Sequence, residues 1–397
     1  MSTDNVFIEV EDQAENEHDL ETDALDFSSA VVSSTDWTTE TIINQINKNN
    51  IELNPEFQRR DAWSRPRKSN FIESLILGLP IPQLVLAERK DKRGAYIVLD
   101  GKQRLLSIRQ FASDKDDKFY RPLKLLSLEI RKDLNGKGID DLRNDPLYVD
   151  DISSFENQPI RTIVIKNWPS EEFLYHVFLR LNTGSVQLAP QELRQALHPG
   201  LFVSYIDKVS SDNSALREIL KIDRPDFRMR DNELLLRHIA FKNFIEIYSG
   251  NLKAFLDNAC KSLNSSWDIT EPIVQDQIEN FNLAHERVKE IFEVNSYRKF
   301  YAGYFEVKFN RAIFDIMTGA FSIPDVRTRS MGREKEIKNA FQELCTNNYE
   351  FLSSIETTTK SLTSTYTRFH TWYTKINEIL GGGCPTITLI DNRIKLG

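Results

Sequence analysis

The chain has 397 residues, 40% of them hydrophobic, and a formal net charge of −8. This length predicts two or three domains with enough apolar residues for a proper core. No apolar run is long enough to cross a bilayer, and the N-terminus lacks the basic and then apolar pattern of a signal peptide. We therefore expect a cytoplasmic, soluble protein with no membrane contact.

The negative charge is concentrated at the start of the chain. Residues 1–47 hold 12 acids and no Lys or Arg, so residues 48–397 hold all 51 bases and the remaining 47 of the 59 acids. This mildly basic body permits contact with nucleic acid without requiring it. The acidic composition predicts a disordered tail over residues 1–34. Such a tail either improves solubility or competes with phosphates for the basic surface.

Two helices are predicted in the first part of the body. One begins near Thr35 and carries a stripe of isoleucines at helical spacing. The other starts after Ser64, a favourable N-cap residue, and ends near Gly78. A short strand over 84–86 follows.

Gln58 and Arg59 stand just upstream of the second helix, among aromatic residues. Arginine binds phosphate through a planar fork of donors, so this pair is a candidate phosphate contact. The alternatives are a solvated loop, or an Arg59 ion pair covered by Trp63.

The most informative stretch is a strand, a tight turn and a helix. Residues 97–99 form a short apolar run with two β-branched residues, Asp100 and Gly101 are typical turn residues, and apolar residues at helical spacing follow. The start of a helix suits an anion because it presents unpaired N–H groups and the positive end of the dipole. Lys102 and Arg104 fall in this first turn, where cations are unfavourable for the helix. We expect a bound phosphate to compensate them; the alternative is a plain junction with two solvated bases.

The rest of the first domain alternates between strands and helices. Asn182 and Thr183 end one helix with a sharp stop, and they either hold a ligand hydroxyl or phosphate or only cap that helix. The elements that we expect here are a strand over 123–130, a polar insertion over 131–158, a strand over 160–165, a helix over 170–181 and a helix from 190.

Beyond residue 200 the apolar pattern becomes helical up to about residue 380. The chain has no P-loop, no GxGxxG after a strand, no GxSxG and no HExxH motif. Its six histidines are scattered without ligand spacing, and its three cysteines are far apart. These patterns argue against a histidine-dependent nuclease or metal centre, and they indicate buried or inert thiols in a reducing compartment.

Several boxes in the right order resemble the GmrSD-type restriction N-terminal domain family. The first covers residues 55–63 and 71–82, and the third covers 178–197. The second, Asp-Gly-Lys-Gln-Arg at 100–104, resembles the family's DGQQR motif. A weaker fourth box lies at 228–237.

This resemblance implies an α+β fold. A ParB/sulfiredoxin-like α/β domain would cover residues 35–200, and an all-α helical domain would cover 201–397. It also implies binding and hydrolysis of a nucleoside triphosphate (GTP or ATP) with Mg²⁺, in bacterial antiphage defence that targets DNA. Carried over by position, the nucleotide-binding residues are Gln58, Arg59, Asp100, Gly101, Lys102, Gln103, Arg104, Arg180, Asn182 and Thr183.

Three of these residues are candidate catalytic residues. Asp100 would hold the metal ion or a water, Gln103 would orient the attacking water or shape the turn, and Arg104 would stabilise phosphate charge. Positioning and charge stabilisation account for most phosphoryl-transfer catalysis, so a small set suffices.

The sequence departs from the family pattern twice. Lys102 stands where the family usually has Gln, which adds a phosphate contact or marks altered chemistry. No histidine constellation of an HNH nuclease follows residue 245. We expect DNA as a partner, together with a nuclease or other defence protein. The alternatives to a nucleoside triphosphatase are a non-catalytic DNA- or partner-binding protein and a DNA nuclease.

Overall fold

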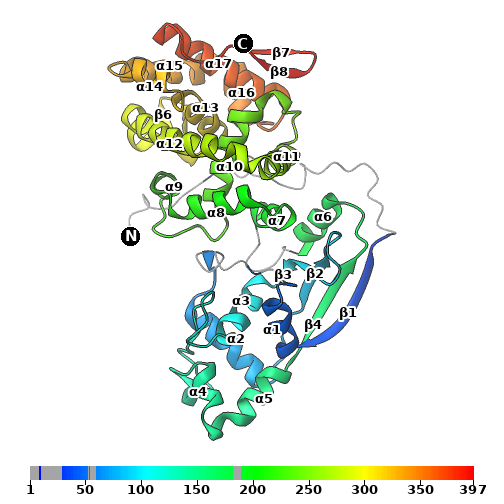
Figure 1. Cartoon of the computed structure of the whole chain (residues 1–397). Helices are drawn as coiled ribbons and strands as arrows, with labels where there is room; N and C mark the ends of the chain where they lie inside the picture. Colours follow the sequence, from blue (N-terminus) through cyan, green and yellow to red (C-terminus); the bar gives the residue numbers. More distant parts are fainter. Residues whose placement is uncertain (1–8, 10–28, 52, 54–59, 182–188) are drawn as a thin grey trace. The chain divides into compact units, whose positions relative to one another are not determined.

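The computed structural model describes residues 9, 29–51, 53, 60–181 and 189–397. The chain forms two compact units (Figure 1). One spans Glu21–Leu197, and the other combines Met1–Leu20 with His198–Gly397. The predicted α+β class is confirmed, because the first unit is a mixed α/β domain and the second is mainly helical.

A four-stranded sheet organises the first unit, in the order β1-β4-β2-β3. Strand β2 runs parallel to β4, whereas β1 pairs antiparallel with β4 and β3 pairs antiparallel with β2. These strands are β1 (Val31–Thr38), β2 (Leu84–Glu88), β3 (Tyr96–Asp100) and β4 (Pro159–Lys166).

Helices cover this sheet, and both faces of its inner strand β2 are buried. Leu84 and Leu86 of β2 join an apolar cluster with residues of α1, α2 and α3. Val85 and Ala87 alternate with them and are buried as well. Helices α6 and α7 pack against β3. The helices are α1 (Thr39–Asn47), α2 (Arg65–Ile76), α3 (Lys102–Phe111), α4 (Ile139–Arg143), α5 (Val149–Asn157), α6 (Glu171–Leu181) and α7 (Pro190–Leu197).

The predicted strand over 123–130 is wrong. Leu123, Leu125 and Leu128 are buried, which explains the strand-like pattern. The backbone of Leu125 pairs instead with the nearby loop, donating to Lys137 O (2.9 Å) and accepting from Gly136 N (2.8 Å). The predicted polar insertion contains α4 and α5. Strand β1 was not predicted, and the first helix begins after it, with Thr38 as its N-cap.

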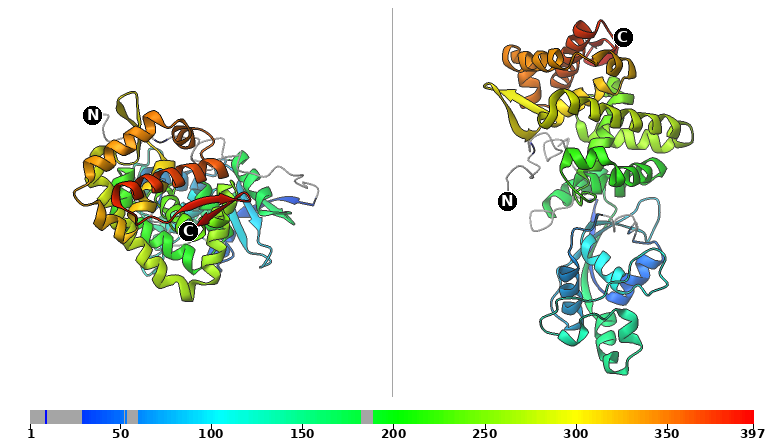
Figure 2. Two further views of the ribbon diagram at one scale, coloured as in Figure 1. Left: turned by 90° about the horizontal axis from the view of Figure 1, so that it is seen from above. Right: turned by 90° about the vertical axis from the view of Figure 1, so that its left-hand side faces the viewer.

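The second unit is a helical domain, as predicted, with two short hairpins that the sequence did not indicate. The hairpin of β5 and β6 projects from the helices as a twisted ribbon (Figure 2, right view, yellow). The hairpins are β5 (Arg298–Tyr301) with β6 (Tyr304–Phe309), and β7 (Ile387–Ile390) with β8 (Arg393–Leu396). The helices are α8 (Leu201–Asp212), α9 (Ser214–Leu220), α10 (Arg230–Phe244), α11 (Leu252–Ser265), α12 (Trp267–Phe292), α13 (Arg311–Phe321), α14 (Pro324–Ser330), α15 (Glu334–Asn347), α16 (Tyr349–Glu356) and α17 (Leu362–Leu380).

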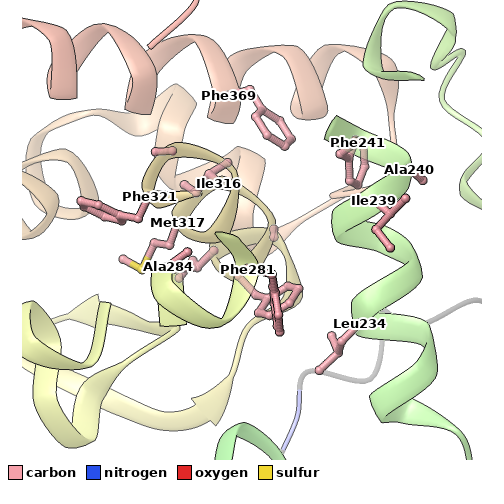
Figure 3. Packing of buried hydrophobic residues seen from close by; sticks show 14 of the residues in the cluster. Leu234, Ile239, Ala240, Phe241, Phe281, Ala284, Ile316, Met317, Phe321 and Phe369 are labelled. Atoms are coloured by element: carbon pink, nitrogen blue, oxygen red, sulfur yellow. The ribbon is translucent and has the colours of Figure 1, made fainter. Parts of the chain in front are cut away.

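Helices α10 and α13 form the centre of this unit, because neighbouring helices pack around both. Their apolar side chains meet residues of α12 and α17 in one large cluster. Figure 3 shows this packing for Leu234, Ile239, Ala240, Phe241, Phe281, Ala284, Ile316, Met317, Phe321 and Phe369.

Charged residues of the fourth box enter this core. Arg237 of α10 donates to both carboxylate oxygens of Asp315 on α13, at 3.0 and 2.5 Å. Arg368 of α17 lies 3.5 Å from the same carboxylate. These side chains are at most 3% exposed, so this part of the fourth box is structural.

The same network reaches the acidic start of the chain. Arg311 donates to both carboxylate oxygens of Glu233, at 3.2 and 3.3 Å. Its Nη1 lies 2.8 Å from Oε2 of Glu9, and the backbone of Glu9 bridges to Phe309. One acid of the leader therefore serves as a counter-ion for a buried arginine.

The cysteine thiols are buried, as predicted. Cys260, Cys345 and Cys384 are buried and form no disulfide, and burial raises the pKa of Cys345 and Cys384 to about 12. The thiols of Cys345 and Cys384 therefore stay protonated near pH 7, and a protonated thiol is a poor nucleophile. In the part of the chain that the structure describes, no helix combines the length and the hydropathy that a membrane span requires.

Candidate functional site

The turn between β3 and α3 requires a glycine. Gly101 has φ = 101°, a left-handed conformation that residues with a Cβ adopt only with strain. A Cβ atom at this position would lie 2.3 Å from Leu84 Cδ2 and 3.2 Å from Arg104 Nη2. The backbone thus passes between an apolar side chain of β2 and a guanidinium group, and α3 starts directly after it (Figure 1).

Arg104 folds back over this turn. Its Nη2 donates to Asp100 Oδ2 (2.8 Å) and to the carbonyl oxygen of Gln83 (3.0 Å). The Arg104 side chain is 14% exposed, whereas Asp100 is 38% exposed. The arginine is therefore held in place from one side, while the carboxylate faces solvent.

Lys102 contacts an acid that is distant in sequence. Its Nζ donates to Glu192 Oε1 at 2.7 Å, and the two side chains are 11% and 9% exposed. The other oxygen of Glu192 accepts from the N–H of Ala189 (2.9 Å) at the start of α7. The cation in the first turn of α3 is thus compensated by a carboxylate of the chain itself. This contact joins the second box to the third.

Two polar atoms at this turn have no hydrogen-bond partner among the described residues. They are Oε1 of Gln103 and Nε of Arg104, and both atoms are buried. Buried polar groups in folded proteins are almost always paired, with protein or with another molecule. An amide oxygen that can accept and a guanidinium N–H that can donate are therefore available to a ligand here.

The end of the first box is fixed to the same helix. Lys68 of α2 donates to Asp61, and it donates to Gln110 Oε1 of α3 at 2.6 Å. Burial lowers the pKa of Lys68 to about 8. Asp61, two residues after Arg59, is thus connected to α3 through the buried ammonium group of Lys68.

The structure brings together five of the predicted residues in one turn, Asp100 to Arg104. Arg180 is exposed in the last turn of α6, the helix that packs against β3. Gln58, Arg59, Asn182 and Thr183 lie outside the described residues. Glu192 lies within the third box, at 178–197, but it was not predicted as a partner of Lys102, because nothing in a single sequence pairs residues so far apart.

One comparison with known proteins gave a match. Residues 39–199 match the family model described as GmrSD restriction endonuclease, N-terminal domain. This range contains the sheet, the β3–α3 turn and Glu192. The searches of curated proteins and of solved structures found no match.

Proposed function

Because residues 39–199 form a domain of the GmrSD restriction endonuclease N-terminal family, we propose that this chain serves a restriction-like defence system that targets DNA. We further propose that it binds and hydrolyses a nucleoside triphosphate, GTP or ATP, at the β3–α3 turn. DNA and a nuclease or other defence protein are the proposed partners.

The observation that carries this proposal is the pairing of the two cations in the turn. Lys102 contacts the carboxylate of Glu192, and Arg104 contacts the carboxylate of Asp100. Phosphate oxygens accept the same charge-assisted hydrogen bonds as carboxylate oxygens, and Arg binds them in a fork. A triphosphate can therefore replace these carboxylates at the N-terminus of α3, where the unpaired N–H groups add further donors.

The residues of the turn also fit Mg²⁺, which is usually held by one or two carboxylates together with substrate phosphates. Asp100 is the carboxylate available for this role, since it is 38% exposed and Arg104 engages its Oδ2. When bound, Mg²⁺ would neutralise charge on the phosphates. The unpaired Oε1 of Gln103 is an acceptor that suits a water molecule beside them.

Phosphate release from ATP, GTP, CTP and UTP tests this function. We would measure it with and without DNA for the wild type, Asp100→Asn and a control, Asp150→Asn, on the exposed first turn of α5. The proposal predicts turnover that Asp100→Asn removes and Asp150→Asn retains. Equal turnover in all three proteins would contradict the site. If the protein neither releases phosphate nor binds a nucleotide, the result would favour a DNA- or partner-binding protein without turnover.

A further inference from the structure

A second group of polar residues lies in the helical unit, around the facing sides of α9 and α12. Glu218 of α9 and His285 and Glu286 of α12 place one carboxylate or imidazole atom each within 4.8 Å of the others. Glu218 and His285 also line a cavity of about 710 Å³. Other residues of its lining are Lys221, Lys289, Tyr297 and Phe309.

His285 directs an unpaired nitrogen into this group. Its side chain is 3% exposed, and its buried Nε2 has no hydrogen-bond partner among the residues that the structure describes. Nε2 lies 3.5 Å from Glu218 Oε2, which is longer than a normal hydrogen bond. An imidazole nitrogen in this position can offer its lone pair to a metal ion.

The other nitrogen of this ring is held by a phenol. His285 Nδ1 lies 3.0 Å from the hydroxyl oxygen of Tyr297, and both groups are buried. A hydroxyl group can donate or accept, so this contact persists in the tautomer that leaves a lone pair on Nε2. Metal-binding histidines are commonly oriented in this way by a partner of the second nitrogen.

The two carboxylates already hold a cation. Lys289 Nζ lies 3.0 Å from Glu218 Oε2 and 2.9 Å from Glu286 Oε2. These side chains are 37 to 56% exposed, so the ammonium group can exchange with solvent ions. The position between the carboxylates and His285 is therefore favourable for positive charge.

We propose that Glu218, His285 and Glu286 bind one divalent first-row metal ion, with Lys289 as its competitor. One nitrogen and two oxygen ligands suit Zn²⁺, whose bonds to such atoms are about 2.1 Å long. Two ligands of a tetrahedral site with these bonds are about 3.4 Å apart. The 3.5 Å between His285 Nε2 and Glu218 Oε2 matches this separation. A water molecule from the cavity would complete the coordination.

Calorimetric titration of the full chain with ZnCl₂, after treatment with a chelator, tests this site. We expect one ion per chain and affinity at least tenfold weaker in His285→Gln and in Glu286→Gln. Lys289→Met should have the opposite effect and bind Zn²⁺ more tightly, since the competing ammonium is gone. The matched control is Glu290→Gln, an exposed acid of α12 that pairs with Arg287 and should bind as the wild type does.

His285 is buried, so its variant needs a check of folding by circular dichroism. Glu286 is exposed, and its variant keeps the test decisive if His285→Gln does not fold. Absence of binding, or equal affinity in Glu286→Gln, Glu290→Gln and the wild type, would overturn the proposal. Weaker binding in Lys289→Met would overturn it as well.

Discussion

The β3–α3 turn and the core around α10 and α13 both pair basic with acidic side chains, yet they differ in exposure. At the turn, Asp100 is 38% exposed and Arg104 is 14% exposed. In the core, Asp315 and Arg237 are 0% and 3% exposed. A pair that water can reach is able to exchange its partner for a ligand at small cost, whereas a buried pair can only be kept or lost. Exposure therefore distinguishes the proposed binding site from a structural contact made of the same types of residue.

The largest expected effect concerns the buried ion pairs around Asp315 in the core. Asp315→Asn leaves Arg237 and Arg368 without their shared carboxylate. Removing one partner of a buried ion pair costs about 3–5 kcal/mol. Denaturant unfolding followed by circular dichroism should show this loss in the transition of the helical unit. A loss below about 1 kcal/mol would mean that the core tolerates these charges unpaired.

A second effect comes from a neutral histidine in the same core. His238 of α10 is 3% exposed, and burial lowers its pKa to about 3. The unfolded chain takes up this proton below about pH 6.5, whereas the folded chain does not. The contribution of the neutral His238 to the free energy of unfolding is thus fully present above pH 6.5. It falls as the pH is lowered, by about 2 kcal/mol at pH 5. In His238→Phe, the free energy of unfolding should fall less between pH 7 and pH 5 than it does in the wild type. An equal fall in both proteins would contradict a neutral, buried His238.

A smaller effect is expected where the acidic leader meets the core. Glu9 is 24% exposed, and its partner Arg311 is 3% exposed. Glu9→Gln should destabilise the protein by about 1 kcal/mol, the upper end of the range for an ion pair that solvent can partly reach. Asp325→Asn, which breaks an exposed pair with Arg329, should change stability by less than about 0.5 kcal/mol. Equal effects would show that the leader contact is an ordinary surface pair.

The smallest effect concerns the second ion pair at the β3–α3 turn, between Lys102 and Glu192. Glu192→Gln releases Lys102 from its carboxylate, so phosphate no longer has to displace it. We expect nucleotide affinity to rise about 5- to 10-fold, since about 1 kcal/mol is no longer spent on breaking the pair. Glu156→Gln, on the surface of the same unit, is the control. Weaker binding in Glu192→Gln would mean that Glu192 acts as part of the nucleotide site itself.

The local pattern of the sequence was sufficient to predict the β3–α3 turn. Its strand, glycine and helix are set by neighbouring residues, and the structure places them as expected. The pattern could not show that Lys102 is neutralised by Glu192, so a bound phosphate was expected as the compensation. Contacts between distant segments depend on packing, which periodicity does not reveal.

The other differences between the predictions and the structure also arise from contacts between distant segments. The buried leucines over 123–130 alternate as in a strand, which suggested a strand there. Such a pattern indicates burial, but it does not show whether the backbone of this segment pairs with another strand. The six histidines showed no ligand spacing, yet His285 meets Glu218 of another helix. The fourth box resembled a family motif, and only burial shows that its Arg237 belongs to the core.

The most direct test of the central claim is an equilibrium titration of labelled GTP and ATP. The proteins would be the wild type, Arg104→Gln and Arg143→Gln, a control that breaks a surface pair with Glu156 in the same unit. We predict at least about tenfold weaker binding in Arg104→Gln, because its charged fork faces the turn. Arg143→Gln should bind as the wild type does. Equal affinity of all three proteins would contradict nucleotide binding at the β3–α3 turn.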